Sequence, residues 1–113
     1  MTDAAIFVLK RVKERGLDAL VCPGDVYAFD IRRILMENGV QVPRNLAITG
    51  FDDLNNSGGE HITGLTSLRI PWVAMIRNAI DILARKMQGE EMPVAEVKLQ
   101  PELIMRESSR FGQ

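Results

Sequence analysis

Apolar residues recur along this chain with two different periods, and the periods predict where its helices and strands lie. The helical period predicts three helices, over Ala4–Arg15, over about Val26–Asn38 and from Pro71 to near Gln88. A glycine follows each helix, at Gly16, Gly39 and Gly89, where a left-handed residue commonly ends a helix. Asp25 stands where the second helix would take its N-cap.

Short apolar runs without alternation lie between the helices and predict strands buried on both faces, as in a parallel sheet covered by helices. The clearest runs are Ala19–Cys22 and Leu46–Thr49, and weaker candidates are Thr66–Arg69, Glu96–Leu99 and Leu103–Met105. The succession of strand, helix and strand over about Ala19–Phe51 is a βαβ unit, in which the two strands run parallel. The sequence therefore predicts an α/β fold with helices flanking a parallel sheet.

The second predicted helix carries apolar residues on two faces. Its larger apolar face is formed by Tyr27, Ala28, Ile31, Ile34 and Leu35. Phe29 and Met36 fall on the opposite face, with Arg32 and Arg33 beside them. A helix that covers a sheet needs only one apolar face. The second face is therefore interpreted as a self-association surface with a polar rim, and two stray exposed apolar residues are the alternative.

The composition is that of one soluble globular domain in a reducing compartment. The chain has 113 residues, is 46% hydrophobic and 26% charged, and has a formal net charge of −1. Its one cysteine, Cys22, is interpreted as a buried small hydrophobe rather than a reactive thiol. No apolar run is long enough to span a bilayer, and no secretory signal pattern is present. A cytoplasmic location without membrane contact is expected.

Acidic residues follow the two clearest predicted strands, and ligands bind at the carboxyl ends of parallel strands in such sheets. The first strand leads into Pro23-Gly24-Asp25, and the second leads into Gly50-Phe51-Asp52-Asp53. A binding site fits this pattern best. A carboxylate such as Asp52 accepts hydrogen bonds from sugar hydroxyls, and an aromatic such as Trp72 stacks on an apolar ring face. Asp53 is expected to turn away from this edge and cap the loop.

Catalysis fits the same residues less well. A flavodoxin-like phosphoacceptor or metal-dependent enzyme would use Asp25, Asp52 and Asp53, but no lysine follows at a strand end. His61, the only histidine, is interpreted as a surface or packing residue, and no dinucleotide-binding fingerprint is present. The sequence thus predicts no catalytic residue, no metal and no cofactor. A structural module without a ligand stays open, with Asp52 as a turn cap and Trp72 in a core.

Four stretches, in order, resemble the effector-binding domain of the lactose/galactose-repressor family of bacterial transcription regulators. They are Pro23-Gly24-Asp25 with Ala28-Phe29-Asp30, Gly39–Asn45 leading to Gly50-Phe51-Asp52-Asp53, Leu65–Pro71, and Leu99–Ser109. The resemblance runs from about Leu17 to Ser109. It implies a two-lobed fold similar to that of periplasmic sugar-binding proteins, with a small effector between the lobes. It also implies a homodimer, with contacts on the second helix and over about Leu54–Ile62.

The resemblance assigns roles by position. Asp52 matches the acid that hydrogen-bonds the effector, a sugar or a similar small molecule, and Trp72 matches a pocket-lining aromatic. Gly24, beside Asp25, stands where an effector-contacting asparagine is common, but Gly24 has no side chain to donate a hydrogen bond.

The resemblance also implies that the chain is the C-terminal part of the domain. Residues 1–69 would belong to the second lobe, 70–93 would be a helix of the first lobe, and 94–113 would be returning strands and a tail. The family's DNA-binding helix-turn-helix does not occur in these residues. DNA binding is therefore expected only through a domain outside this chain, in keeping with its balanced charge.

Overall fold

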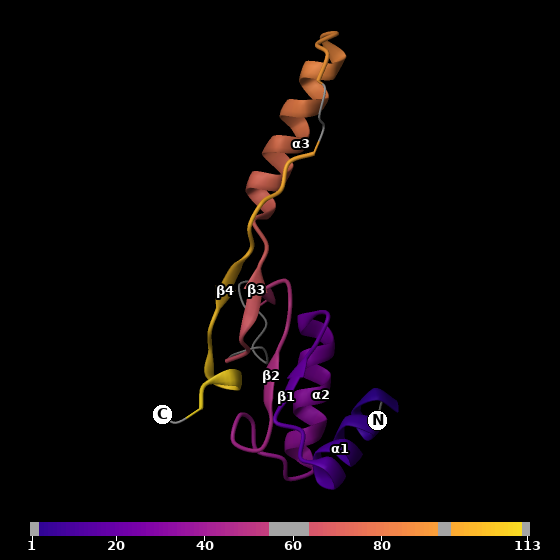
Figure 1. Ribbon diagram of the computed structural model, residues 1–113, viewed down its shortest axis with the longest axis vertical. Helices are drawn as coiled ribbons and strands as arrows, with labels where there is room; N and C mark the ends of the chain where they lie inside the picture. The colour runs from indigo at the N-terminus through magenta and orange to yellow at the C-terminus, as the bar shows by residue number, and fades with distance from the viewer. Residues whose placement is uncertain (1–2, 55–63, 93–95, 112–113) are drawn as a thin grey trace. The chain divides into compact units, whose positions relative to one another are not determined.

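The computed structural model describes residues 3–54, 64–92 and 96–111. The chain divides into two compact units, the first formed by Met1–Arg69 with Leu103–Gln113 and the second by Ile70–Glu102. In chain order the elements are α1 (Asp3–Arg15), β1 (Ala19–Val21), α2 (Asp25–Glu37), β2 (Ala47–Thr49), β3 (Ser67–Arg69), α3 (Trp72–Met87), β4 (Glu102–Ile104) and the 3-10 helix η2 (Glu107–Ser109) (Figure 1).

The first unit is built on the predicted βαβ unit, which the structure confirms. Strands β1 and β2 pair in parallel, with Ala19 opposite Ala47 and Val21 opposite Thr49. The chain beyond the following loop continues this arrangement, because Thr66 forms a parallel bridge with Thr49. Strand β3 in turn pairs with β4. Residues distant in sequence are thus brought next to the end of β2.

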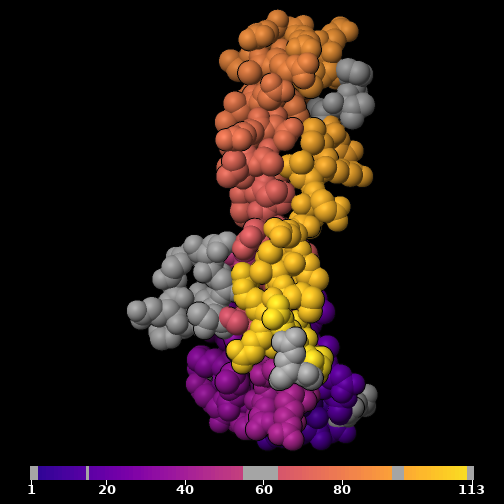
Figure 2. Space-filling view, turned by 90° about the vertical axis from the view of Figure 1, so that its left-hand side faces the viewer, coloured from indigo at the N-terminus to yellow at the C-terminus, as the bar shows by residue number. Residues whose placement is uncertain are grey.

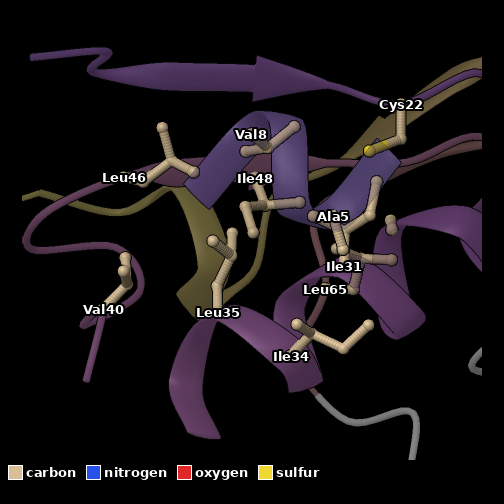
Figure 3. Packing of buried hydrophobic residues seen from close by; sticks show 11 residues of the cluster. Ala5, Val8, Cys22, Ile31, Ile34, Leu35, Val40, Leu46, Ile48 and Leu65 are labelled. Atoms are coloured by element: carbon tan, nitrogen blue, oxygen red, sulfur yellow. The ribbon is translucent and has the colours of Figure 1, made fainter. Parts of the chain in front are cut away.

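The hydrophobic core of the first unit lies between α1, α2 and β2 (Figure 3). Its buried members are Ala5, Val8, Cys22, Ala28, Ile31, Ile34, Leu35, Val40, Leu46, Ile48 and Leu65. Cys22 is therefore confirmed as a buried hydrophobe, and its burial, followed by the charge of Asp25, raises the pKa of its thiol. Gly39 ends α2 with a φ of 82°, and Val40 then turns back into the core.

Two predictions about the strands are wrong. The first strand was expected to be buried on both faces, but Val21 is 80% exposed and Leu20 is only partly buried. Within the described residues, β1 pairs with β2 alone, so it is an edge strand. The second correction concerns Glu96–Leu99, which forms no strand.

Helix α3 of the second unit exposes its apolar face. The large apolar residues of this face are Trp72, Val73, Ile76, Ile80, Leu83 and Met87, and all of them are exposed. Residues 96–101 run along the helix within the same unit (Figures 1 and 2). Of the α3 residues, Ala74, Asn78 and Ile82 are partly buried. Among the described residues, no helix is long and apolar enough to cross a membrane.

Candidate functional site

The loops that follow β1 and β2 meet at one edge of the sheet, as the sequence predicts. The Asp25 N–H donates to the Phe51 carbonyl oxygen at 2.9 Å, which joins the two loops directly. A Cβ atom built on Gly24 would lie 3.7 Å from Asp52 Oδ2, so the Asp52 carboxylate lies beside Gly24. Asp52 is partly exposed there. We use the term strand-end edge for the place where these two loops meet, which is marked by Gly24 and Asp52.

Asp25 holds the two loops together from the inside. Its carboxylate is fully buried, and Oδ1 accepts a hydrogen bond from Ser67 Oγ at 2.7 Å while Oδ2 accepts one from the Leu54 N–H at 2.8 Å. The sequence also predicts Asp25 as an effector contact, and in this structure both of its oxygens bind donors of the chain itself. The predicted N-cap role of Asp25 is wrong: Gly24 is the N-cap of α2, and Asp25 is the first helical residue.

Gly50 makes the close approach of Asp25 possible. A Cβ atom at this position would overlap Asp25 Oδ1 and lie 3.0 Å from Leu65 Cδ2. The Gly50 N–H also donates to the Thr66 carbonyl oxygen at 2.9 Å. The residue after β2 is therefore confined by α2 on one side and by the chain around Leu65 on the other, and only glycine fits.

The backbone after Phe51 turns through two left-handed residues, Asp52 with a φ of 102° and Asp53 with a φ of 55°. This conformation costs about 1–2 kcal/mol per residue with a side chain. Two hydrogen bonds offset this cost: the Asp52 N–H donates to the Leu68 carbonyl oxygen at 3.0 Å, and the Asp53 N–H donates to Ser67 Oγ at 3.1 Å. The turn leaves Asp52 at the strand-end edge and buries Asp53.

Asp53 is the centre of a buried ion-pair network rather than the loop cap that the sequence predicts. Arg69 Nε lies 2.7 Å from its Oδ2, and Arg106 Nη2 lies 2.7 Å from its Oδ1. Burial alone would raise the pKa of this carboxyl group. The hydrogen bonds from Arg69 and Arg106 outweigh burial and lower the pKa below its ordinary value of 3.8.

Sequence reasoning assigned no role to Arg106 and Ser108, although both lie in the closing motif Leu99–Ser109. Arg106 Nη1 donates to the Leu65 carbonyl oxygen at 2.8 Å. Ser108 Oγ accepts a hydrogen bond from the Thr66 N–H at 2.8 Å. The motif therefore attaches the end of the chain to the segment that leads into β3. The Arg-x-Ser spacing in this motif is the sequence signal from which a role for these two residues could have been predicted.

The predicted dimer residues on α2 do not form one uniformly exposed face. Phe29 is partly buried and packs against the core, so its assignment to the side opposite the core is wrong. Tyr27, predicted to face the core, is 63% exposed, because it lies where α2 begins at the strand-end edge. Met36 is 52% exposed, and Arg33 is exposed and pairs with Glu37 at 3.1 Å.

The remaining predicted residues lie in different parts of the chain. Arg32 is partly buried on α2, and Leu54 is partly buried beside Asp25. Trp72 is the first residue of α3, in the second unit, and is 55% exposed. His61 and the rest of the predicted dimer loop lie outside the described residues.

Comparison with known proteins identifies the class to which this fold belongs. Residues 2–109 match the family described as the periplasmic binding protein-like domain, and the chain belongs to this family. Several relatives that resemble it are named as transcription regulators or repressors, which confirms the resemblance to the lactose/galactose-repressor family.

Three relatives illustrate the match. An uncharacterized HTH-type transcriptional regulator of Streptomyces limosus is 33% identical over 96 residues, which are 85% of this chain and 27% of the relative. The arabinose metabolism transcriptional repressor of Geobacillus stearothermophilus is 29% identical, over 90% of this chain and 28% of its own length. The transcriptional regulator CelR, solved in complex with cellobiose, superposes with a TM-score of 0.77 at 25% identity, over 95% of this chain and 33% of CelR. The chain thus spans a quarter to a third of these relatives.

The enzyme alternative receives no support from these findings. The relatives are named as transcription regulators. Two of the three aspartates that a phosphoacceptor would need, Asp25 and Asp53, are engaged by other groups of the chain. The described residues contain no group of three or more His, Cys, Asp or Glu side chains that could hold a metal ion.

Proposed function

We propose that this chain is the effector-sensing part of a cytoplasmic transcription regulator that responds to a sugar or a similar small polar ligand. The observation that carries the proposal is the Asp52 carboxylate, held at the strand-end edge beside Gly24 by a left-handed turn. Ligands bind at such an edge in open α/β sheets. The name of the arabinose repressor and the cellobiose bound to CelR support a carbohydrate as the ligand.

In this proposal Asp52 is the polar anchor of the ligand. A carboxylate accepts hydrogen bonds from two neighbouring hydroxyl groups, which is the arrangement that a sugar ring offers. Gly24 contributes space instead of a side chain, so a hydroxyl group can approach the backbone at the start of α2. Trp72 is proposed as a second ligand contact on the resemblance alone. DNA binding belongs to a separate helix-turn-helix domain of the whole regulator.

Calorimetric titration of the chain with cellobiose and, separately, with arabinose tests the proposal. We expect a saturable heat of binding with at least one of these sugars, because each of them is named with one of the relatives. Mannitol, which has no ring, is the matched control and should give little heat. Absence of saturable binding for both sugars, together with no helix-turn-helix encoded upstream in the same reading frame, would contradict the proposal.

We also propose that α2 forms part of a homodimer contact, centred on Met36 rather than on Phe29. The Met36 side chain is half-exposed, and burying a large apolar side chain contributes about 1.5–3 kcal/mol. In a two-fold interface each copy contributes the same residue, so a single substitution acts twice. Arg33, exposed beside Met36, would lie at the polar rim.

The Met36→Glu variant should therefore dissociate at least tenfold more readily than the wild type in sedimentation experiments. Met105→Glu is the matched control, since Met105 is 50% exposed and lies outside α2. A wild-type chain that is monomeric at micromolar concentration would refute the dimer. Equal effects of the two substitutions would place the contact elsewhere.

A further inference from the structure

The buried Asp53 carboxylate is bound by two arginines that come from separate parts of the chain. Arg69 Nε contacts Oδ2 and Arg106 Nη2 contacts Oδ1, each at 2.7 Å. Arg69 is the last residue of the first unit before the chain enters the second unit at Ile70, and Arg106 follows shortly after the chain returns at Leu103. One carboxylate is thus attached to both segments that connect the units. We call Asp53, Arg69 and Arg106 the Asp53 clamp.

Arg106 ties its segment to two partners at once. While Nη2 contacts Asp53, Nη1 donates to the Leu65 carbonyl oxygen at 2.8 Å. A planar guanidinium can hold two such partners in a fixed geometry, and a lysine ammonium cannot reproduce it. The Arg106 N–H also donates to Thr66 Oγ1 at 2.8 Å, so the returning segment is fixed beside the segment that leads into β3.

The clamp is also attached to the turn that presents Asp52. Asp53 follows Asp52 directly, and both residues are left-handed. The Asp53 side chain is fully buried, whereas Arg69 and Arg106 keep 40% and 20% of their side chains exposed. Removing the carboxylate charge would take the shared ion-pair partner from Arg69 and Arg106 and leave two like charges close together, which is unfavourable at a partly buried position. The ion pairs therefore favour this turn over a relaxed backbone.

We infer that Asp53 is the positioning residue of the strand-end edge: it fixes the turn that presents Asp52 and ties that turn to both connecting segments. A ligand on Asp52 is then coupled through the adjacent residue to the points where the chain leaves and re-enters the first unit. This coupling rests on the proposed function, whereas the clamp itself does not.

Hydrogen-exchange mass spectrometry of the ligand-free chain tests the clamp. The Asp53→Asn variant should exchange about tenfold faster or more at the amides of residues 67–69 and 103–108. The Arg69→Met variant removes the ion pair between Arg69 and Asp53 and keeps the one between Arg106 and Asp53, so it should loosen residues 67–69 more than residues 103–108. Asp30→Asn is the matched control, because Asp30 pairs with Arg33 on the exposed surface of α2. Unchanged exchange in both segments of Asp53→Asn, or of Arg69→Met if the first variant does not fold, overturns the inference.

A spectroscopic readout separates positioning from general stability. The Arg69 Nε–H donates to Asp53, so its ¹⁵N NMR signal should persist at neutral pH in the wild type and be lost in Asp53→Asn. The folded-state pKa of Asp53 lies below 3.8, so the signal should be intact above pH 3.8 and weaken only as the pH falls through that lower value. A signal that is the same in Asp53→Asn and in the wild type would show that the ion pair does not hold Arg69.

A titration with sugars distinguishes failure of the clamp from failure of the proposed function. Cellobiose and arabinose are titrated into the wild type and into folded Asp53→Asn. If a sugar binds the wild type, the variant should bind it at least several-fold more weakly and should show less protection of residues 67–69 and 103–108. Equal affinity in the two proteins refutes the positioning role. If neither sugar binds the wild type, the sugar-binding role of the strand-end edge fails, and the exchange data alone decide the clamp.

Discussion

Replacing Gly50 with alanine should destabilise the first unit by about 3 kcal/mol, the upper part of the range for overpacked cores. The added methyl group would overlap the Asp25 carboxylate and press against Leu65 Cδ2 at 3.0 Å. Asp25 cannot retreat easily, because it is bound by Ser67 and by the Leu54 N–H, and Leu65 is fully buried in the core. Chemical denaturation followed by circular dichroism measures the change.

Two controls identify the cause of this loss. Alanine at Gly24 meets no atom closer than 3.7 Å, so Gly24→Ala should cost clearly less than Gly50→Ala. In an Asp25→Ala background the main collision is removed, and Gly50→Ala should then cost much less than it does alone. Additive effects of the two substitutions would show that Asp25 is not what confines position 50.

Replacing Asp52 with asparagine should weaken sugar binding by about tenfold to a hundredfold while the fold is kept. A hydrogen bond to a charged group contributes about 1.5–3 kcal/mol, and each 1.4 kcal/mol is a factor of ten in affinity. Asparagine has the same shape and also tolerates the left-handed φ of 102° at this position. The partly exposed side chain can therefore change without loss of packing.

Asp30→Asn is again the matched control, because it removes an exposed carboxylate of α2 away from the strand-end edge. Calorimetric titration of the two variants and the wild type gives the affinities, and thermal melts confirm that all three are folded. Affinity that is unchanged in Asp52→Asn would remove Asp52 from the site, even if the chain binds sugar.

The sequence predicts the elements of the first unit well because their signals are local. Helix α2 and strand β2 follow from apolar runs that end at Gly39 and Gly50, and the loops at the ends of β1 and β2 mark the edge where Asp52 lies. A parallel pairing follows from the βαβ order alone. The location of the candidate site is therefore readable from spacing and from the rule for strand ends.

The roles of the neighbouring aspartates are not readable in this way, because their partners are distant in sequence. Asp25 is bound by Ser67, and Asp53 is bound by Arg69 and Arg106. Each of these residues alone looks like an ordinary surface residue, and only the fold brings them together. The same limit applies to α3. The spacing of its apolar residues shows that the helix has an apolar face, but it does not show what covers that face.

A ¹H–¹⁵N NMR titration of the labelled chain with cellobiose and then with arabinose locates the bound sugar and so tests whether a ligand binds at the strand-end edge. We expect the largest shifts at Gly24, Asp25 and Gly50–Leu54, with smaller shifts at residues 67–69 and 103–108. Asp52→Asn should reduce these shifts at the same sugar concentration. Shifts confined to other parts of the chain, or a spectrum that does not change with either sugar at saturating concentration, would contradict a sugar site at the strand-end edge.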